Sequence, residues 1–211
     1  MDTPITLIIL IATGLVSWRA FENTSLLQKL LHHPYSVKHN KEYYRLFSHM
    51  LVHSGVPHLL LNMFVFYSFG RVVESVLRMK YGMATGSLYF ILLYVLGGLA
   101  ASLPSMRKHS DDYSYSAVGA SGAVSAVMMA FMIMYPTQEI AFFFIISMPA
   151  FIGVFVFFLL EHLMAKNMKT NIAHDAHIWG ALFGILFVAI LDINYLIGFV
   201  QQVQAYVTSF F

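Results

Sequence analysis

The chain contains no cysteine among its 211 residues. This absence excludes disulfides, thiolate nucleophiles and cysteine-ligated metals, so any nucleophile must be an oxygen or a nitrogen. Charged residues are also scarce, at 10% of the chain, which is about two-fifths of the usual share. Because 59% of the residues are hydrophobic, too few polar side chains remain to cover a water-facing surface. The composition therefore predicts an integral membrane protein.

The chain is instead rich in long apolar stretches. Uncharged stretches of about 17 to 25 residues are typical of membrane-spanning helices, because that many residues cross a hydrocarbon core of about 30 Å. We count six and predict an all-α bundle of six transmembrane helices in one domain, residues 1–211. The predicted spans are about 4–21, 57–76, 83–103, 119–135, 140–160 and 176–198. Pro149 lies inside the fifth span, where we expect it to kink the helix.

The longest connection, residues 19–56, follows the first predicted span. In the segment "TSLLQKLLHHP", leucines at 26, 27, 30 and 31 have the spacing of a short amphipathic helix. Such a helix is expected to lie in the interface between lipid and water. We therefore predict a structured first loop that packs on the membrane surface.

The basic residues are distributed unevenly over the predicted loops. The formal net charge of +2 is too small to favour nucleic-acid binding, and no basic run is interleaved with aromatics. The loops after the first, third and fifth spans hold nine Lys and Arg: Arg19, Lys29, Lys38, Lys41, Arg45, Arg107, Lys108, Lys166 and Lys169. The other side holds Arg71, Arg78 and Lys80. On its own, the positive-inside rule would place the first loop in the cytoplasm.

Polar side chains at membrane depth are costly and therefore candidates for function. They form three groups: "HMLVHSGVPHLLLN" with His49, His53, His58 and Asn62; "GASGA" with Ser121; and "AHDAHIWGALFG" with His174, Asp175 and His177. The pairs 49/53 and 58/62 are each four residues apart, which places each pair on one helical face. Alternating topology starts the helices of His58, Ser121 and His177 from the same side of the membrane, so these three can meet.

Each group also has a structural explanation. Ser121 between Gly residues could serve close helix packing or cap a helix, and His58 and Asn62 could bond loop carbonyls. However, His177, Gly180 and Gly184 lie at positions i, i+3 and i+7, so the imidazole shares the face that allows close approach. This shared face favours a catalytic role for Ser121 and His177 over a purely structural one.

The combination predicts a serine nucleophile with a histidine base. Contact between the fourth and sixth helices would bring Ser121 Oγ within about 2.6 to 3.2 Å of His177. Asn62, His58 and the Ser121 N–H would stabilise an oxyanion. Asp175, two residues from His177, would point elsewhere on a helix, so we predict a Ser-His dyad without a third member. The α/β-hydrolase elbow G-x-S-x-G does not fit, because residue 123 is Ala.

From Arg45 to about Gly184 these motifs resemble those of the rhomboid family of intramembrane serine proteases. The resemblance rests on the histidine and asparagine four apart, on "GASG" and on "AHIWGALFG", in that order. It implies that Ser121 is the nucleophile, His177 the base, and His58 and Asn62 the oxyanion groups. It also implies structural support from Arg45, Glu74, Gly119, Gly122, Gly180 and Gly184.

The same resemblance carries expectations beyond the two reacting residues. In that family the fifth helix and the loop before the sixth act as gate and cap, which gives Pro149 and residues 165–175 a candidate role. Substrates would be transmembrane segments of other proteins within the lipid, and no metal or cofactor is implied. The active site would face the extracytoplasmic side of a bacterial inner membrane, against the positive-inside count.

Ser125 departs from the pattern of the family, which often has an aromatic residue four positions after the nucleophile. Another group must therefore orient His177.

Two rival readings remain open at this point. The histidine pairs 49/53 and 174/177 could ligate zinc or haem iron, although no H-E-x-x-H occurs and no helix offers an acidic partner beside them. A catalytically inactive relative that only binds membrane helices is the other rival, although such proteins typically lack the serine or the histidine. The oligomeric state does not follow from the sequence.

Overall fold

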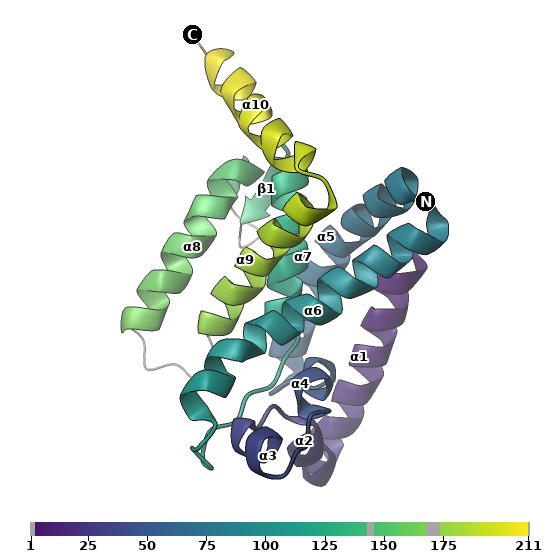
Figure 1. Cartoon of the computed structure of the whole chain (residues 1–211), viewed down its shortest axis with the longest axis vertical. Coiled ribbons are helices and arrows are strands. Elements are labelled where there is room, and N and C mark those ends of the chain that lie inside the picture. Colours follow the sequence, from purple (N-terminus) through teal and green to yellow (C-terminus); the bar gives the residue numbers. More distant parts are fainter. Residues whose placement is uncertain (1–2, 143–145, 168–173, 211) are drawn as a thin grey trace.

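The structure, a computed structural model, describes residues 3–142, 146–167 and 174–210 (Figure 1). The helices are α1 (Pro4–Glu22), α2 (Thr24–Leu30), α3 (Pro34–His39), α4 (Arg45–Ser48), α5 (Val56–Tyr81), α6 (Met83–His109), α7 (Ser121–Met134), α8 (Ala150–Asn167), α9 (His174–Leu191) and α10 (Asn194–Thr208). A short 3-10 helix, η1 (His49–Leu51), follows α4. Strands β1 (Glu139–Phe142) and β2 (Ile146–Pro149) pair antiparallel. The described chain is thus mostly helical, as the composition predicts.

Four of the described helices are long and apolar enough to cross a membrane, namely α1, α5, α6 and α9. Helices α7 and α8 are apolar but shorter. The predicted spans 4–21, 57–76, 83–103 and 119–135 coincide with α1, α5, α6 and α7. Helices α5 and α6 continue past the predicted ends, because their last turns carry basic residues that end an apolar stretch without ending a helix.

The predicted fifth span, 140–160, is wrong in its first half. Residues 139–142 and 146–149 belong to the β1–β2 hairpin, and α8 begins only at Ala150. Pro149 ends β2 directly before α8, so the expected kink inside a helix is also wrong. Apolar runs rich in Phe and Ile suit a strand as well as a helix, and hydropathy does not distinguish the two.

The predicted sixth span, 176–198, is divided between two helices. Helix α9 begins at His174 and ends at Leu191, and α10 begins at Asn194. The Asp192 carboxylate accepts a hydrogen bond from the Asn194 backbone N–H, at 2.9 Å, and pairs with Lys80 on α5. These bonds favour a turn where the apolar pattern alone predicts a continuous helix.

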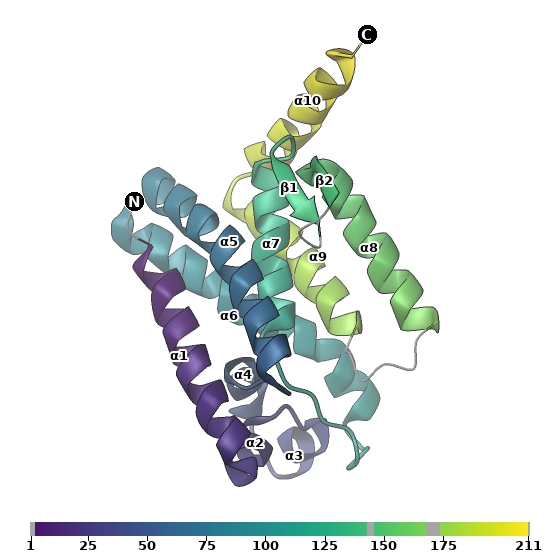
Figure 2. The same ribbon diagram turned by 180° about the vertical axis from the view of Figure 1, so that it is seen from behind.

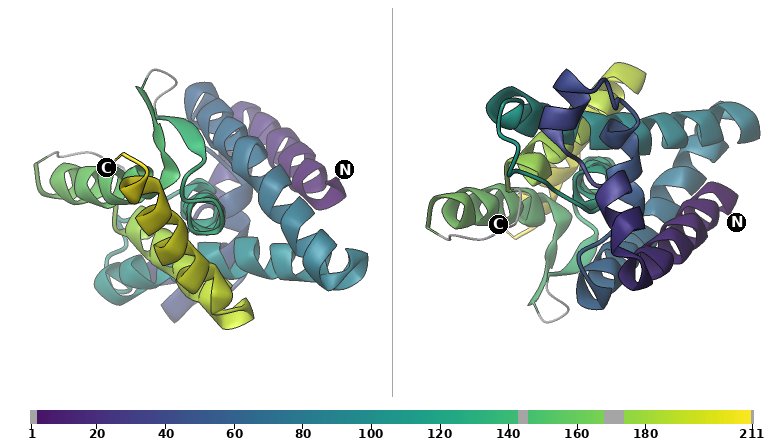
Figure 3. Two further views of the ribbon diagram at one scale, coloured as in Figure 1. Left: turned by 90° about the horizontal axis from the view of Figure 1, so that it is seen from above. Right: turned by 90° about the horizontal axis from the view of Figure 1, so that it is seen from below.

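Helix α7 lies in the middle of the bundle. It packs against α5, α6, α8, α9 and α10 and is seen end-on near the centre of Figure 3. Most of its side chains are buried, whereas large apolar side chains such as Ile8, Leu15, Phe155 and Ile190 are exposed on the surrounding helices. An apolar interior combined with an apolar outer face is expected in lipid.

The segment between α1 and α5 is folded. Helices α2, α3 and α4 lie together at the end of the bundle where α5 and α7 begin (Figures 1 and 2). The short helix predicted around the leucines at 26 to 31 is confirmed by α2. Helix α5 begins at Val56, so His49 in η1 and His53 in the following loop do not share a helical face as predicted.

Candidate active site

Ser121 is the first residue of the central helix α7, and the chain before it needs a glycine. Gly119 has φ 117°, in the left-handed region that other residues rarely adopt. The Gly119 N–H donates to His49 O at 3.0 Å, and His49 Nδ1 donates back to Gly119 O at 3.2 Å. The first loop thus fixes the segment that leads into Ser121.

Ser121 and His177 meet, as the spacing predicts. Ser121 Oγ lies 2.7 Å from His177 Nε2, although 56 positions separate them. The close approach depends on glycine: a Cβ added to Gly180 would lie 2.1 Å from Gly122 O, and one added to Gly184 would lie 2.2 Å from Ala126 O. A Cβ at Gly122 would also lie 2.3 Å from Ala101 Cβ. The same glycines therefore allow α7 to pack on α9 and bring the two polar side chains into contact.

Glu161 of α8 contacts the other side of His177. His177 Nδ1 lies 2.9 Å from Glu161 Oε1, and His174 Nδ1 lies 2.7 Å from Glu161 Oε2. The prediction that no acidic residue lies beside the 174/177 pair is therefore wrong, whereas Asp175 is exposed. Glu161 was missed because the predicted fifth span ended one residue before it. The sequence signal that could have found Glu161 is a single carboxylate directly after a long apolar run.

The hydrogen bonds of His177 assign its tautomer. Glu161 offers only acceptor oxygens, so the proton of a neutral His177 lies on Nδ1. Nε2 then carries a lone pair that accepts the Ser121 hydroxyl proton in a hydrogen bond. This is the tautomer that a general base requires.

Ser121 lies at the N-terminus of α7, among the first backbone amides of that helix. The first N–H groups of a helix have no intrahelical partner, and the N-cap residue of α7, Ala120, has no side chain that could bond them. These amides and the helix dipole favour negative charge at that end.

His58 of α5 contacts the segment that leads into this helix terminus, and Asn62 lies one turn further along α5. The His58 ring packs on Gly119, where an added Cβ would lie 2.8 Å from His58 Cε1. Asn62 is buried, and its amide nitrogen donates to His58 O at 2.9 Å. One of the two amide hydrogens of Asn62 is used in that bond.

Arg45 and Glu74 lie outside the reacting group and contact backbone. The Arg45 guanidinium donates to the carbonyls of Gln28 and Leu31, at 2.8 and 3.0 Å, and pairs with Glu42. These bonds connect α4 to the end of α2.

The fully buried Glu74 carboxylate accepts the N–H groups of Ile5 and Thr6 at 3.0 and 2.8 Å. It therefore joins α5 to the start of α1.

The remaining expectations concern the gate, the cap and Ser125. Pro149 lies at the start of α8, at the other end of that helix from Glu161. Of the expected cap, residues 165–175, positions 168–173 lie outside the described residues. Ser125 is buried one turn beyond Ser121. The group that bonds His177 on the side away from Ser121 is thus Glu161 on α8.

The histidines of the first loop are engaged with separate partners. His53 contacts Ser17 Oγ through Nδ1 at 3.0 Å and accepts the Ala120 N–H through Nε2 at 3.4 Å. Burial lowers the pKa of His49 to about 4 and that of His53 to about 3. Both are therefore neutral at pH 7, and their described bonds lead to separate partners, Gly119 for His49 and Ser17 and Ala120 for His53.

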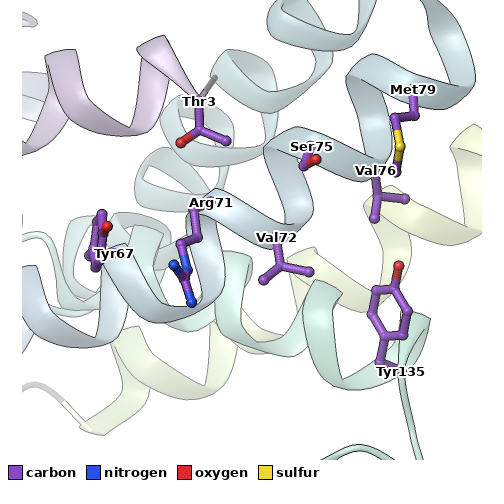
Figure 4. Close-up of a pocket in the computed structure, with 8 residues that line it drawn as sticks. All are labelled: Thr3, Tyr67, Arg71, Val72, Ser75, Val76, Met79 and Tyr135. Carbon is purple, nitrogen blue, oxygen red and sulfur yellow. The ribbon is translucent and has the colours of Figure 1, made fainter. Parts of the chain in front are cut away.

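A cavity of about 390 Å³ lies away from this group of residues. Its lining includes Thr3, Tyr67, Arg71, Ser75 and Tyr135 (Figure 4). Tyr135 follows the last residue of α7 and Ser121 is the first, about 20 Å apart at helical rise. The cavity is therefore separate from the Ser121 site.

Comparison with known proteins gives one family. A model described as "Rhomboid domain" matches residues 40–193. "RHOMBOID-like protein 12, mitochondrial" of Arabidopsis thaliana is 26% identical over 188 residues, which are 85% of this chain and 55% of that protein. "Putative rhomboid protease YdcA" of Bacillus subtilis (strain 168) is 28% identical over 149 residues, 70% of this chain and 66% of that protein.

A third relative, "RHOMBOID-like protein 9, chloroplastic" of Arabidopsis thaliana, is 33% identical over 92 residues, 44% of this chain and 18% of that protein. The chain thus spans 55%, 66% and 18% of the lengths of these three relatives. The family model covers well over half of the chain and includes Ser121, His177 and Glu161. The chain therefore belongs to the rhomboid family.

Proposed function

We propose that this protein is an intramembrane serine endopeptidase that cleaves transmembrane segments of other proteins. The observation that carries the proposal is the 2.7 Å contact of Ser121 Oγ with His177 Nε2 at the N-terminus of a central helix. Family membership supports a protease, and the apolar outer surface supports work inside a membrane.

Acylation is the first half of the proposed reaction. Ser121 Oγ attacks the carbonyl carbon of the scissile peptide, and His177 Nε2 takes the hydroxyl proton. The carbonyl oxygen becomes an oxyanion, which the uncapped amides of α7, the Asn62 amide and a His58 N–H stabilise. His177 then gives its proton to the leaving amine as the peptide bond breaks, leaving an ester on Ser121.

Deacylation restores the enzyme. His177 takes a proton from a water molecule, which attacks the ester carbonyl, and Ser121 Oγ leaves and recovers that proton.

The substrate helix must unwind locally, because its amide groups are otherwise hydrogen-bonded along the helix. Small residues at the cleavage point would pass most easily between the helices.

The next part of the proposal is the membrane in which the protein lies. The chain is a multi-pass integral membrane protein of the rhomboid family. We propose the inner membrane of a bacterial cell, with Ser121 open to the extracytoplasmic side. Two of the relatives are named for plant mitochondria and chloroplasts.

Cleavage by purified protein tests the proposal. Wild type, Ser121→Ala and His177→Ala are incubated in detergent or liposomes with a model transmembrane substrate. We expect cleavage by wild type and a loss of about 10³-fold or more in both variants. Equal cleavage by wild type and Ser121→Ala would refute the mechanism. If folded wild type binds the substrate helix without cutting it, the inactive relative is the better description.

A metal-dependent hydrolase is a second candidate, favoured by one observation. Ligand atoms of Glu161, His174 and His177 lie within 4.8 Å of one another, and two histidines with one glutamate are a known zinc-binding set. However, hydrogen bonds from two Nδ1–H groups already satisfy both carboxylate oxygens, and Nε2 of His177 contacts Ser121. Activity that falls on chelation and returns with zinc would favour this candidate, whereas the serine mechanism predicts no change with EDTA.

A further inference from the structure

The Glu161 carboxylate has no part in the bond-making steps described above. It lies on α8, and its side chain is 14% exposed. A carboxylate at this depth in an apolar helix is costly unless its oxygens receive hydrogen bonds. Each oxygen receives one, Oε1 from His177 and Oε2 from His174.

We infer that Glu161 is a positioning residue, which fixes the tautomer and the ring orientation of His177 and so extends the Ser-His pair to a serine, histidine and glutamate series. This inference rests on the proposed function. The acceptor at Oε1 keeps the proton on Nδ1, 2.9 Å away, and so leaves Nε2 to face Ser121 Oγ at 2.7 Å. When His177 becomes an imidazolium during attack, the same carboxylate lies beside the new charge.

His174 positions the carboxylate in turn. It is 6% exposed and donates to Oε2 at 2.7 Å, which prevents the carboxylate from rotating away from His177. Through this bond His174 can contribute to catalysis by way of Glu161. One continuous series of hydrogen bonds therefore runs from His174 through Glu161 and His177 to Ser121, and it connects α9, α8 and α7.

The placement of Glu161 on α8 links helix packing to the base. The buried side chains that α8 directs into the bundle, such as Val154 and Phe157, are apolar and fix no orientation at His177. Glu161 supplies a directional contact near the other end of α8. When α8 lies against α9, His177 is held, and a displacement of this end of α8 would release it.

Kinetics of four variants test the inference. Glu161→Leu removes both acceptor oxygens at similar volume, Glu161→Gln keeps one, His174→Ala leaves the Glu161–His177 bond, and His162→Ala changes an exposed neighbour on α8. We expect kcat to fall about 10² to 10⁴-fold in Glu161→Leu and at least about tenfold in Glu161→Gln, with KM changed less than about threefold. His174→Ala should lose less kcat than Glu161→Leu, and His162→Ala should match wild type.

Thermal midpoints show which variants are folded, and Glu161→Gln carries the test if Glu161→Leu is not. Wild-type kcat in a folded Glu161 variant would overturn the inference. So would equal kcat losses in His174→Ala and Glu161→Leu, because equal losses indicate that the carboxylate only joins α8 to α9. Ser121→Ala in the same assay distinguishes failure of the proposed function from failure of the positioning role. Activity in Ser121→Ala would refute the proposed function. Activity that is lost in Ser121→Ala but kept in the Glu161 variants would refute only the positioning role.

Discussion

At the scale of single residues, the site combines one reactive contact with several polar groups held by the loop and the helix ends. Ser121 and His177 are joined at 2.7 Å, and His58 packs on Gly119, two residues before Ser121. His177 is also held by Glu161, and His58 by Ser54, through bonds other than their proposed catalytic ones. Removal of a donor should therefore affect the reaction more than the fold.

Asn62→Ala tests the oxyanion assignment. In the proposed mechanism its amide donates to the oxyanion, and the loss of one such donor costs about 10² to 10³-fold in kcat. We expect a loss of this size with little change in KM, measured as initial rates of substrate cleavage. Ser68→Ala, a half-buried change on the same helix whose hydroxyl donates only to the carbonyl of Phe64 one turn away among the bonds described, is the matched control. A kcat for Asn62→Ala equal to that of Ser68→Ala would remove Asn62 from the mechanism.

His49 predicts a loss of stability in acid. Burial lowers its pKa from 6.5 to about 4, so between these values the unfolded chain binds a proton that the folded chain does not. Stability from this residue is fully present above pH 6.5 and falls as the pH decreases to about 4. Thermal inactivation in detergent at pH 7 and pH 5 measures the effect.

His49→Asn provides the comparison, because its amide can keep the bond to Gly119 O but does not titrate. We expect a smaller loss between pH 7 and pH 5 in this variant than in wild type. An identical loss in both proteins would exclude His49 as a source of the acid sensitivity.

At the scale of elements, glycine faces place α7 against α9. The Cβ positions at Gly180 and Gly184 would each overlap a backbone carbonyl of α7. The two helices can therefore approach only as these residues allow. The same contact sets the distance between Ser121 and His177.

Gly180→Ala should separate the two helices. The added methyl would lie 2.1 Å from Gly122 O, and overpacking of this kind typically costs about 1 to 3 kcal/mol. We expect a lower thermal midpoint together with a fall in cleavage rate of about tenfold or more. Gly14→Ala in α1, where no atom lies within 4 Å, should leave both unchanged. Equal behaviour of the two variants would contradict this packing account.

Part of the fold and site could be predicted from the sequence, because local patterns carry it. Apolar length gave α1, α5, α6 and α7, and the shared face of His177 with Gly180 gave the contact to Ser121. The hairpin at 139–149 could not be predicted from hydropathy, because strands and helices bury the same residue types. Glu161 was missed because the predicted fifth span ended one residue before it, so nothing placed its carboxylate on a helix that faces His174 and His177.

At the scale of the whole molecule, the two ends of the bundle differ. The first loop, Ser121 and the bonds from Glu161 to His174 and His177 lie at one end. Glu74 of α5, which bonds the start of α1, and the cavity beside Arg71 lie towards the other. The family expectation and the positive-inside count give opposite orientations for these ends. The six-span count and the single domain stay predictions beside the four long apolar helices.

Tag accessibility decides the orientation. We expect a tag inserted at the exposed Lys41, in the first loop, to be reached by protease from outside intact cells or spheroplasts. A tag after Phe211 serves as the comparison for the opposite side. Protection of the first-loop tag until the membrane is opened would reverse the proposed orientation and leave the chemistry unchanged.

The most direct measurement of the central claim is covalent labelling of the purified protein by a fluorophosphonate, followed by mass spectrometry of its peptides. An activated serine is phosphonylated, whereas an ordinary buried or capping serine is not. The account predicts label on Ser121 in wild type and a strong loss of label in His177→Ala. Label on another residue, or a folded, lipid-reconstituted wild type that acquires no label at Ser121, would contradict it.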